Sequence, residues 1–244
     1  SVTEEWSVAT LSGPNAGKIL KAAGVDISLD PADFPFMTMR EAHIAGLPVR
    51  IFRISFTGEL SYEINIRARH GLALWTHLMK AGAEFGITPY GTEAMHVLRA
   101  EKGFIIVGQE TDGSVTPQDL GMDWIVSKVK PDYIGKRALE RASMAADNRK
   151  QLVGLRTKER KQVIPEGAHA VLDPNQPMPM DMLGQVTSSY YSPNVGSSIA
   201  MAMLKGGRAL MGGTVYLPML DGSVIEAEVV EPIFYDPKGE RLNG

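Results

Sequence analysis

The sequence predicts an α+β fold followed by a small β-barrel or jelly roll. Two patterns support this. In the first 150 residues, stretches of alternating polarity that favour strands are interspersed with stretches of helical periodicity. From residue 151, short strand-like segments recur at regular spacing between turns rich in Gly and Pro. The length of 244 residues allows a core in each part. We therefore expect an α+β domain over 1–150 and a barrel domain over 151–244.

The first elements follow from local pattern. Residues 6–11 read as a strand, and a helix begins after it at Pro14, an early position that proline tolerates. Gly24 is placed to end this helix. The inward face of the helix is expected to carry Ile19, Leu20 and Ala23.

Two strands and a second helix complete the first region. Residues 49–54 read as a strand covered on both faces, and residues 60–67 as a cleaner half-buried strand. The turn over 56–59 joins them as a hairpin. The helix that follows ends near Gly82 or Gly86, and its apolar face is expected to carry Leu72, Trp75, Leu78 and Met79.

A third helix, over about 92–102, places a carboxylate in an unfavourable position. Glu101 lies three residues after Leu98 and four after Val97, so it falls on the apolar side. It also lies in the last turn, where the helix dipole disfavours negative charge. Burial there would cost free energy unless the group were paired. Glu101 is therefore expected to accept hydrogen bonds, to form an internal ion pair, or to be exposed on a frayed helix end.

The predicted barrel begins after a charged stretch over 141–150. Its strands are expected at 152–156, 168–172, 184–190, 197–203, 214–217 and 224–230.

Composition excludes several classes of protein. The net charge of −3 gives no polyanion-binding signature, and the absence of cysteine excludes disulfides and thiolate chemistry. No apolar run approaches the roughly 18 residues of a membrane span. These features fit a cytoplasmic protein. The chain opens at Ser1 without an initiator Met, so we expect a piece of a longer polypeptide.

Standard catalytic motifs are not evident. The histidines show no metal-site spacing, so no metal is expected, and there is no GxSxG, GxGxxG or Walker motif. The basic run over 156–161 fits a solvated turn, or a contact with an anionic ligand tail or a partner subunit.

An ordered set of short motifs resembles the folate-dependent aminomethyltransferases, which include the glycine cleavage T-protein. The set covers nearly the whole chain: PFM at 35–37, FTGELSYEI at 56–64, LRAEKG at 98–103, LGMDW at 120–124, YIGK at 133–136, GQVTS at 184–188, SP at 192–193 and IAMA at 199–202. The variant EKGFIIVGQETDG at 101–113 resembles one branch, the T-protein-like domain of heterotetrameric sarcosine oxidase alpha subunits.

The resemblance implies roles for four residues. In the family, the glutamate at the position of Glu101 pairs with the pterin ring of tetrahydrofolate. A carboxylate offers two coplanar acceptors to a ring N–H beside an exocyclic amine. Phe56, Tyr62 and Trp124 are candidates to line or stack on the ring. Relatives often carry Tyr at the position of Phe56, so a hydroxyl role would be lost here. The anionic folate tail would suit a cation such as Lys128, Lys130 or Arg156.

The catalytic aspartate of the family lies upstream of where this chain begins. No residue of the sequence matches it, so the catalytic residue stays unknown. The chain alone is expected to be inactive, and the N-terminal part of the family fold to be missing from it.

The branch implies a function for the whole assembly. A flavin site elsewhere would oxidise sarcosine, and this domain would hold tetrahydrofolate to form 5,10-methylenetetrahydrofolate. Flavin and NAD are expected only elsewhere in the assembly. The partners would be the other subunits and the missing half of the alpha subunit, with no nucleic acid or membrane. Alternatives are a glycine-cleavage aminomethyltransferase, the folate domain of a dimethylglycine dehydrogenase, and a non-catalytic folate-binding or scaffold module.

Overall fold

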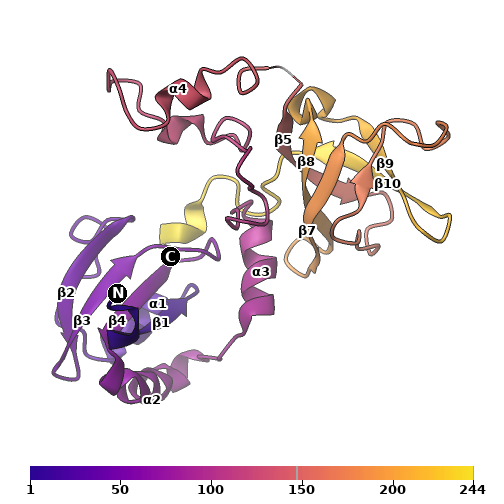
Figure 1. The fold of residues 1–244 in the computed structure, drawn as a ribbon. Helices are drawn as coiled ribbons and strands as arrows, with labels where there is room; N and C mark the ends of the chain where they lie inside the picture. Colours follow the sequence, from indigo (N-terminus) through magenta and orange to yellow (C-terminus); the bar gives the residue numbers. More distant parts are fainter. Residues whose placement is uncertain (147, 244) are drawn as a thin grey trace. The chain divides into compact units, whose positions relative to one another are not determined.

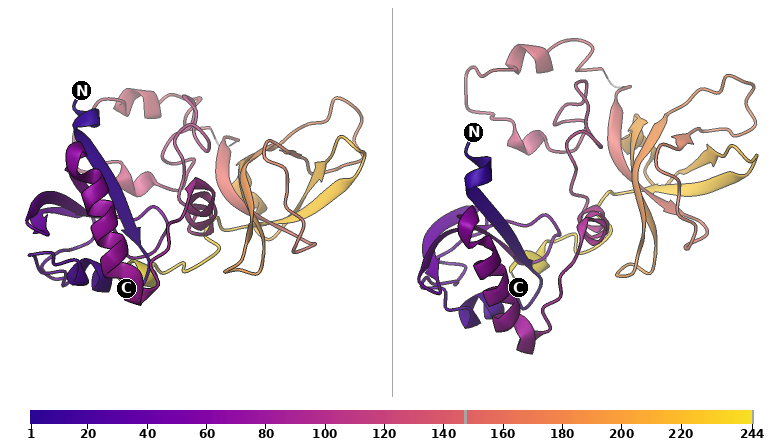
Figure 2. Two further views of the ribbon diagram at one scale, coloured as in Figure 1. Left: turned by 90° about the horizontal axis from the view of Figure 1, so that it is seen from below. Right: turned by 60° about the horizontal axis from the view of Figure 1, so that its bottom comes forward.

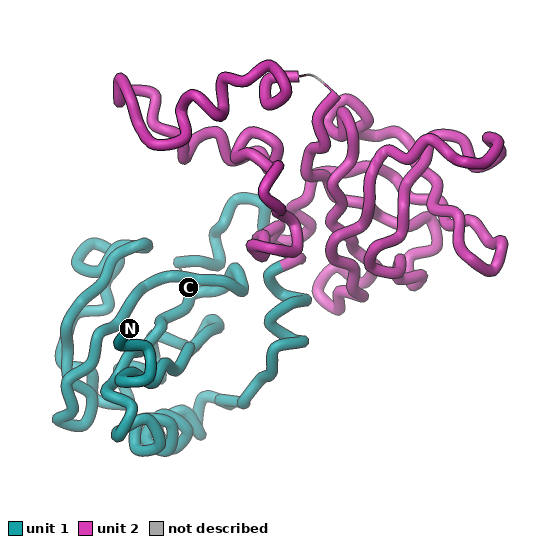
Figure 3. The backbone as a smooth tube through the Cα atoms, in the orientation of Figure 1, with its two compact units in different colours: residues 1–99, 236–244 teal, residues 100–235 magenta. Residues whose placement is uncertain are grey.

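The protein folds as two compact units. A computed structural model describes residues 1–146 and 148–243. Unit 1 contains residues 1–99 and the C-terminal segment from Asp236, and unit 2 contains residues 100–235. Figure 1 shows the elements, and Figure 3 colours the two units separately.

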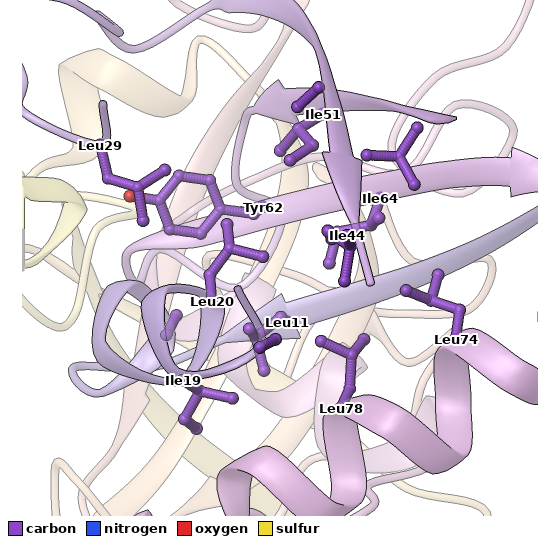
Figure 4. Packing of buried hydrophobic residues seen from close by; sticks show 14 of the residues in the cluster. Leu11, Ile19, Leu20, Leu29, Ile44, Ile51, Tyr62, Ile64, Leu74 and Leu78 are labelled. Carbon is purple, nitrogen blue, oxygen red and sulfur yellow. The ribbon is translucent and has the colours of Figure 1, made fainter. Parts of the chain in front are cut away.

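Unit 1 is a four-stranded antiparallel sheet covered by helices. The strand order is β1-β4-β3-β2, with β1 at Trp6–Ser12, β2 at Thr38–Ile44, β3 at Leu47–Arg53 and β4 at Ser61–Arg67. Helices α1 (Ala16–Ala22) and α2 (Gly71–Gly82) pack on the sheet through a continuous apolar core. Figure 4 shows side chains from both helices meeting those of the strands. The α+β prediction and the hairpin over 56–59 are confirmed, whereas β2 lies outside the predicted strands.

The structure corrects two details of unit 1. Strand β3 is not covered on both faces, because Val49 and Ile51 are buried and Arg50 is exposed. Helix α2 buries Leu74 and Leu78, whereas Leu72 is 79% exposed and Trp75 is 50% exposed. Apolar residues surround much of this helix, so periodicity alone did not identify the stripe that the sheet covers.

Unit 2 contains a closed six-stranded antiparallel barrel. The strand order is β6-β7-β8-β5-β10-β9. The strands are β5 at Lys150–Thr157, β6 at His169–Ala170, β7 at Gly184–Ser192, β8 at Ser197–Lys205, β9 at Thr214–Pro218 and β10 at Val224–Val230. Val171 and Tyr216 exchange backbone hydrogen bonds of 2.8 and 3.0 Å, which close the barrel between β6 and β9. All the predicted barrel strands are confirmed, and Figure 2 shows them from two further sides.

The remaining elements are short, apart from α3 at Thr92–Glu101, which the sequence analysis predicted. Helix α4 covers Lys136–Leu139. The 3-10 helices are η1 at Thr3–Glu5, η2 at Ala68–His70, η3 at Ala83–Phe85, η4 at Asp123–Ile125, η5 at Gly207–Leu210 and η6 at Glu240–Asn243. The division into compact units groups 100–149 with the barrel, so the domains 1–150 and 151–244 stay a prediction. Within the described residues, no helix is long and apolar enough to cross a membrane.

A buried ion pair anchors the loop region of unit 2 to the barrel. The Asp119 carboxylate accepts from Arg149 Nε at 2.9 Å and from the Thr116 hydroxyl at 2.9 Å. The Asp119 carbonyl accepts from the backbone N–H of Leu152 on β5 at 2.8 Å. Burial works to raise the pKa of Asp119, but the hydrogen bonds from Arg149 and Thr116 outweigh it and hold the pKa below its ordinary value.

This pair predicts an acid-sensitive contribution to stability. Because the folded-state pKa of Asp119 is lowered, the contribution is complete above the unfolded-state pKa of about 3.9 and is lost as the pH falls through the folded-state value. Asp119→Asn should lower the free energy of unfolding near pH 7 by about 3 kcal/mol, because it leaves the charge of Arg149 without its carboxylate partner. It should also flatten the loss of stability in acid. Urea unfolding at several pH values measures both effects.

Asp181→Asn is the matched control, because Asp181 is a carboxylate in the same unit with a side chain 90% exposed. A stability profile of Asp119→Asn that matches the control would show that the pair contributes nothing to stability.

Candidate functional site

Glu101 ends α3 at a tightly packed turn. Gly103 follows with φ +73°, and its N–H donates to the Ala100 carbonyl at 3.0 Å. A Cβ at this position would lie 2.5 Å from the carbonyl oxygen of Pro232. Glycine is therefore required here both by backbone conformation and by the close approach of the 232–235 segment.

The Glu101 carboxylate is buried and hydrogen-bonded. Its exposed fraction is 2%. Oε1 accepts from the Ser192 hydroxyl at 2.6 Å, and Oε2 accepts from Asn194 Nδ2 at 2.8 Å. The expectation that Glu101 accepts hydrogen bonds is confirmed, and the alternative of an exposed, frayed helix end is wrong. The donors are neutral, so the charge is stabilised by hydrogen bonds and no cation takes part in these two contacts.

The backbone of Glu101 joins a third segment. Its carbonyl accepts from the N–H of Phe234 at 2.9 Å and from that of Tyr235 at 3.0 Å. Ser192 ends β7, and its hydroxyl also accepts from the N–H of Val195 in the turn before β8 at 2.9 Å. Glu101 therefore connects the helix end, the β7–β8 turn and the chain after β10.

A second buried carboxylate lies nearby in the sequence and contacts the same strand. Glu110 is 1% exposed, accepts from the Ser188 hydroxyl at 2.5 Å and accepts from the N–H of Ile106 at 2.7 Å. Gln109 Nε2 donates to the Thr187 carbonyl at 2.8 Å. The sequence alone did not predict the burial of Glu110, which appears there only within the motif that resembles one branch of the family.

The other predicted site residues divide between the units. Trp124 lies on η4 in unit 2 and is 71% exposed. Phe56 is half-buried in the β3–β4 turn of unit 1. Tyr62 lies in the core of unit 1, 1% exposed, with its ring centroid 6.0 Å from that of Phe34. Among the described residues, Glu101 and Trp124 share no hydrogen bond, and the rings of Phe56 and Tyr62 make no contact with each other.

The candidate cations for a folate tail lie in unit 2. Lys128 and Lys130 are exposed, and Lys128 Nζ lies 3.9 Å from Asp123. Arg156 is half-buried on β5. In the basic run over 156–161, residues 158–161 are exposed and Lys158 pairs with Glu226 at 2.8 Å, which fits the solvated turn.

Unit 1 contains a cavity of about 500 Å³ beside β1. Residues of β1, the start of α1, α2 and the segment over 85–92 line it. Burial raises the pKa of Tyr90 in its wall, and a hydrogen bond with Ser12 opposes that rise. No three His, Asp or Glu side chains in the described ranges gather so as to hold a metal ion.

Family comparisons agree with this architecture. Residues 1–130 match the GCVT N-terminal domain, and residues 150–236 match the glycine cleavage T-protein C-terminal barrel domain. The chain belongs to the glycine cleavage T-protein family, and the predicted fold class is confirmed.

Three individual relatives show how far the similarity extends. The chain is 44% identical over its whole length to sarcosine oxidase subunit alpha of Corynebacterium sp. (strain P-1), of which it spans only 25%. It is 33% identical to human mitochondrial dimethylglycine dehydrogenase, over 99% of this chain and 27% of that protein. The crystal structure of the glycine cleavage system aminomethyltransferase T from Bartonella henselae matches 94% of this chain and 60% of its own, with a TM-score of 0.78 and 25% identity.

The Glu101 contacts predict a stability effect. Ser192→Ala should lower the free energy of unfolding by about 1–3 kcal/mol, because it removes a buried donor to a carboxylate. Ser143→Ala, at an exposed serine of the same unit, is the control. Urea unfolding compares the two variants, and equal midpoints for both would contradict a stabilising role for the Ser192–Glu101 bond.

Proposed function

We propose that this chain is the tetrahydrofolate-binding part of a sarcosine oxidase alpha subunit, where it captures the one-carbon unit of oxidised sarcosine. The supporting observation is the 44% identity over the whole chain to such a subunit, against 33% for dimethylglycine dehydrogenase. The chain spans about a quarter of the length of that relative, and we propose that the activity needs the rest of the assembly.

Glu101 is the residue that we propose to bind the pterin ring. Its carboxylate has about four acceptor positions, of which Ser192 and Asn194 use two. Ser192 is fully buried, whereas Asn194 is exposed. We propose that Ser192 holds the carboxylate in place and that the pterin edge replaces Asn194 at Oε2. A bidentate contact of a ring N–H and an exocyclic amine would then orient the ring.

Aromatic side chains within each unit are further candidates to contact a folate. Trp124 is 71% exposed, so its indole face is free to stack on a flat ring. Phe56 would offer a half-buried apolar edge without the hydroxyl that relatives often carry. Tyr62 would contribute from within the core of unit 1, where its ring is covered. We propose Lys128, Lys130 or Arg156 for the folate tail.

The chemistry would rest on holding two reactants together. Tetrahydrofolate supplies a nucleophilic nitrogen when it is bound. A nitrogen held beside the one-carbon unit reacts faster than one in solution, and it competes with hydrolysis to formaldehyde. We assign no catalytic residue in this chain. Flavin and NAD would bind elsewhere in the assembly, since the sequence carries no dinucleotide-binding motif.

A second candidate function follows from the same carboxylate. Glu101 is 2% exposed and already accepts two side-chain hydrogen bonds, as a purely structural residue would. This observation favours a non-catalytic module that supports its partner subunits. Folate affinity and stability are therefore measured on the same variants. A folate-binding function predicts a change in affinity, whereas a purely structural function predicts a change in stability alone.

Glu101→Gln tests the pterin contact. The substitution replaces one acceptor with an amide donor that faces the pterin donors. Folinate binding, measured by calorimetric titration, should weaken by about 1–3 kcal/mol. Glu110→Gln, at the other buried carboxylate of unit 2, should leave folinate affinity unchanged. Equal affinities for both variants and the parent chain would exclude Glu101 as a folate ligand and favour the structural module.

Trp124→Ala tests the stacking contact. Loss of the indole should weaken folinate binding by about 1 kcal/mol, the typical value of an aromatic pair. Trp75→Ala is the matched control, because Trp75 is 50% exposed on α2 and has no proposed role. The same titration gives both values, and an unchanged affinity for Trp124→Ala would remove Trp124 from the site.

A further inference from the structure

A buried guanidinium in unit 1 has no acidic partner. Arg53, at the end of β3, is 2% exposed. Its Nη1 donates to the Phe34 carbonyl at 2.7 Å. Its Nε is buried without an acceptor, and no carboxylate of residues 1–146 and 148–243 pairs with it. One hydrogen bond therefore serves a group with five N–H donors.

This arrangement is costly for the fold. A buried cation is normally paired and fully hydrogen-bonded, because the low-dielectric interior replaces its hydration poorly. Nε is closed off from solvent, so the donors of Nη2 are those that a ligand can reach. A carboxylate oxygen is a strong acceptor for a guanidinium donor.

A small cavity lies against this guanidinium. It measures about 200 Å³, and its polar wall consists of Arg53, the buried Tyr62, Lys18 and Lys21 of α1, and Asn243. Burial raises the pKa of Tyr62, so its hydroxyl stays protonated and can donate. Lys18 and Lys21 are exposed, so the positive charge extends from the buried wall to the rim.

We propose that this cavity binds a small dicarboxylate. One carboxylate would accept from Arg53 Nη2 and from the Tyr62 hydroxyl. The other carboxylate would lie toward the ammonium groups of Lys18 and Lys21. A volume of about 200 Å³ has room for a chain of a few carbons. Two donors, from Arg53 Nη2 and from the Tyr62 hydroxyl, suit the two oxygens of a carboxylate better than a spherical anion.

Succinate is the probe for this site. It is titrated calorimetrically into the chain, with sodium chloride adjusted to keep the ionic strength constant. The parent chain should bind succinate saturably and should not bind succinamide, which has the same length without the charges. Tyr62→Phe keeps the ring and removes one donor, and should weaken binding about tenfold. Lys21→Gln, at the rim, should weaken it about threefold.

Lys80→Gln is the matched control, because Lys80 is an exposed lysine of unit 1 outside the cavity wall. It should bind succinate like the parent chain. Circular dichroism of each variant checks that the fold is kept. Folinate plays no part in this titration, so its outcome does not depend on the proposed folate site.

Three results would overturn the proposal. They are no saturable binding of succinate by the parent chain, equal binding of succinate and succinamide, and equal weakening by Lys21→Gln and Lys80→Gln. Each would contradict a dicarboxylate site in this cavity.

Discussion

The buried Glu101 carboxylate is the contact on which the organisation of unit 2 depends. Hydrogen bonds from Ser192 and Asn194 hold its side chain, and those from Phe234 and Tyr235 hold its carbonyl. The helix end, a barrel turn and the segment after the last strand thus meet at one residue. A negative charge at the C-terminal end of a helix is unfavourable in isolation, and here neutral donors offset that cost.

On the outer face of the barrel, neutral hydroxyl donors satisfy both buried carboxylates. Beyond the irregularity in register near Val186, β7 presents Ser188 to Glu110 and Ser192 to Glu101. A separate apolar cluster covers the same side of the barrel. It combines buried residues of β5 and β8 with Ala100, Ile105 and Phe234 from the flanking segments. Polar contacts therefore fix the register of the covering segment, and apolar contacts supply most of the burial.

The sequence predicted the fold better than the site. Alternation in the barrel strands and the helix around Ile19 and Leu20 follow from short-range periodicity, which the structure confirms. Strand β2 lacks such a pattern, because Arg40, Glu41 and His43 point to solvent beside a single buried stripe. The burial of Glu101 was indicated by its helical position, but its donors lie more than 90 residues away and no local pattern relates them. The burial of Arg53 could not be predicted, because nothing in the sequence distinguishes a buried cation from other residues of the predicted strand over 49–54.

The barrel closes through Val171 and Tyr216, beside a strand of only two residues. Closure removes the free strand edges that would otherwise template association between chains. Because β6 is so short, its pairing with β9 is the weakest in the barrel, so local opening should begin there. Opening there would expose two unpaired edges while the rest of the barrel stays folded. The shelf life and protease resistance of the protein would then follow the frequency of that local event rather than the global free energy of unfolding.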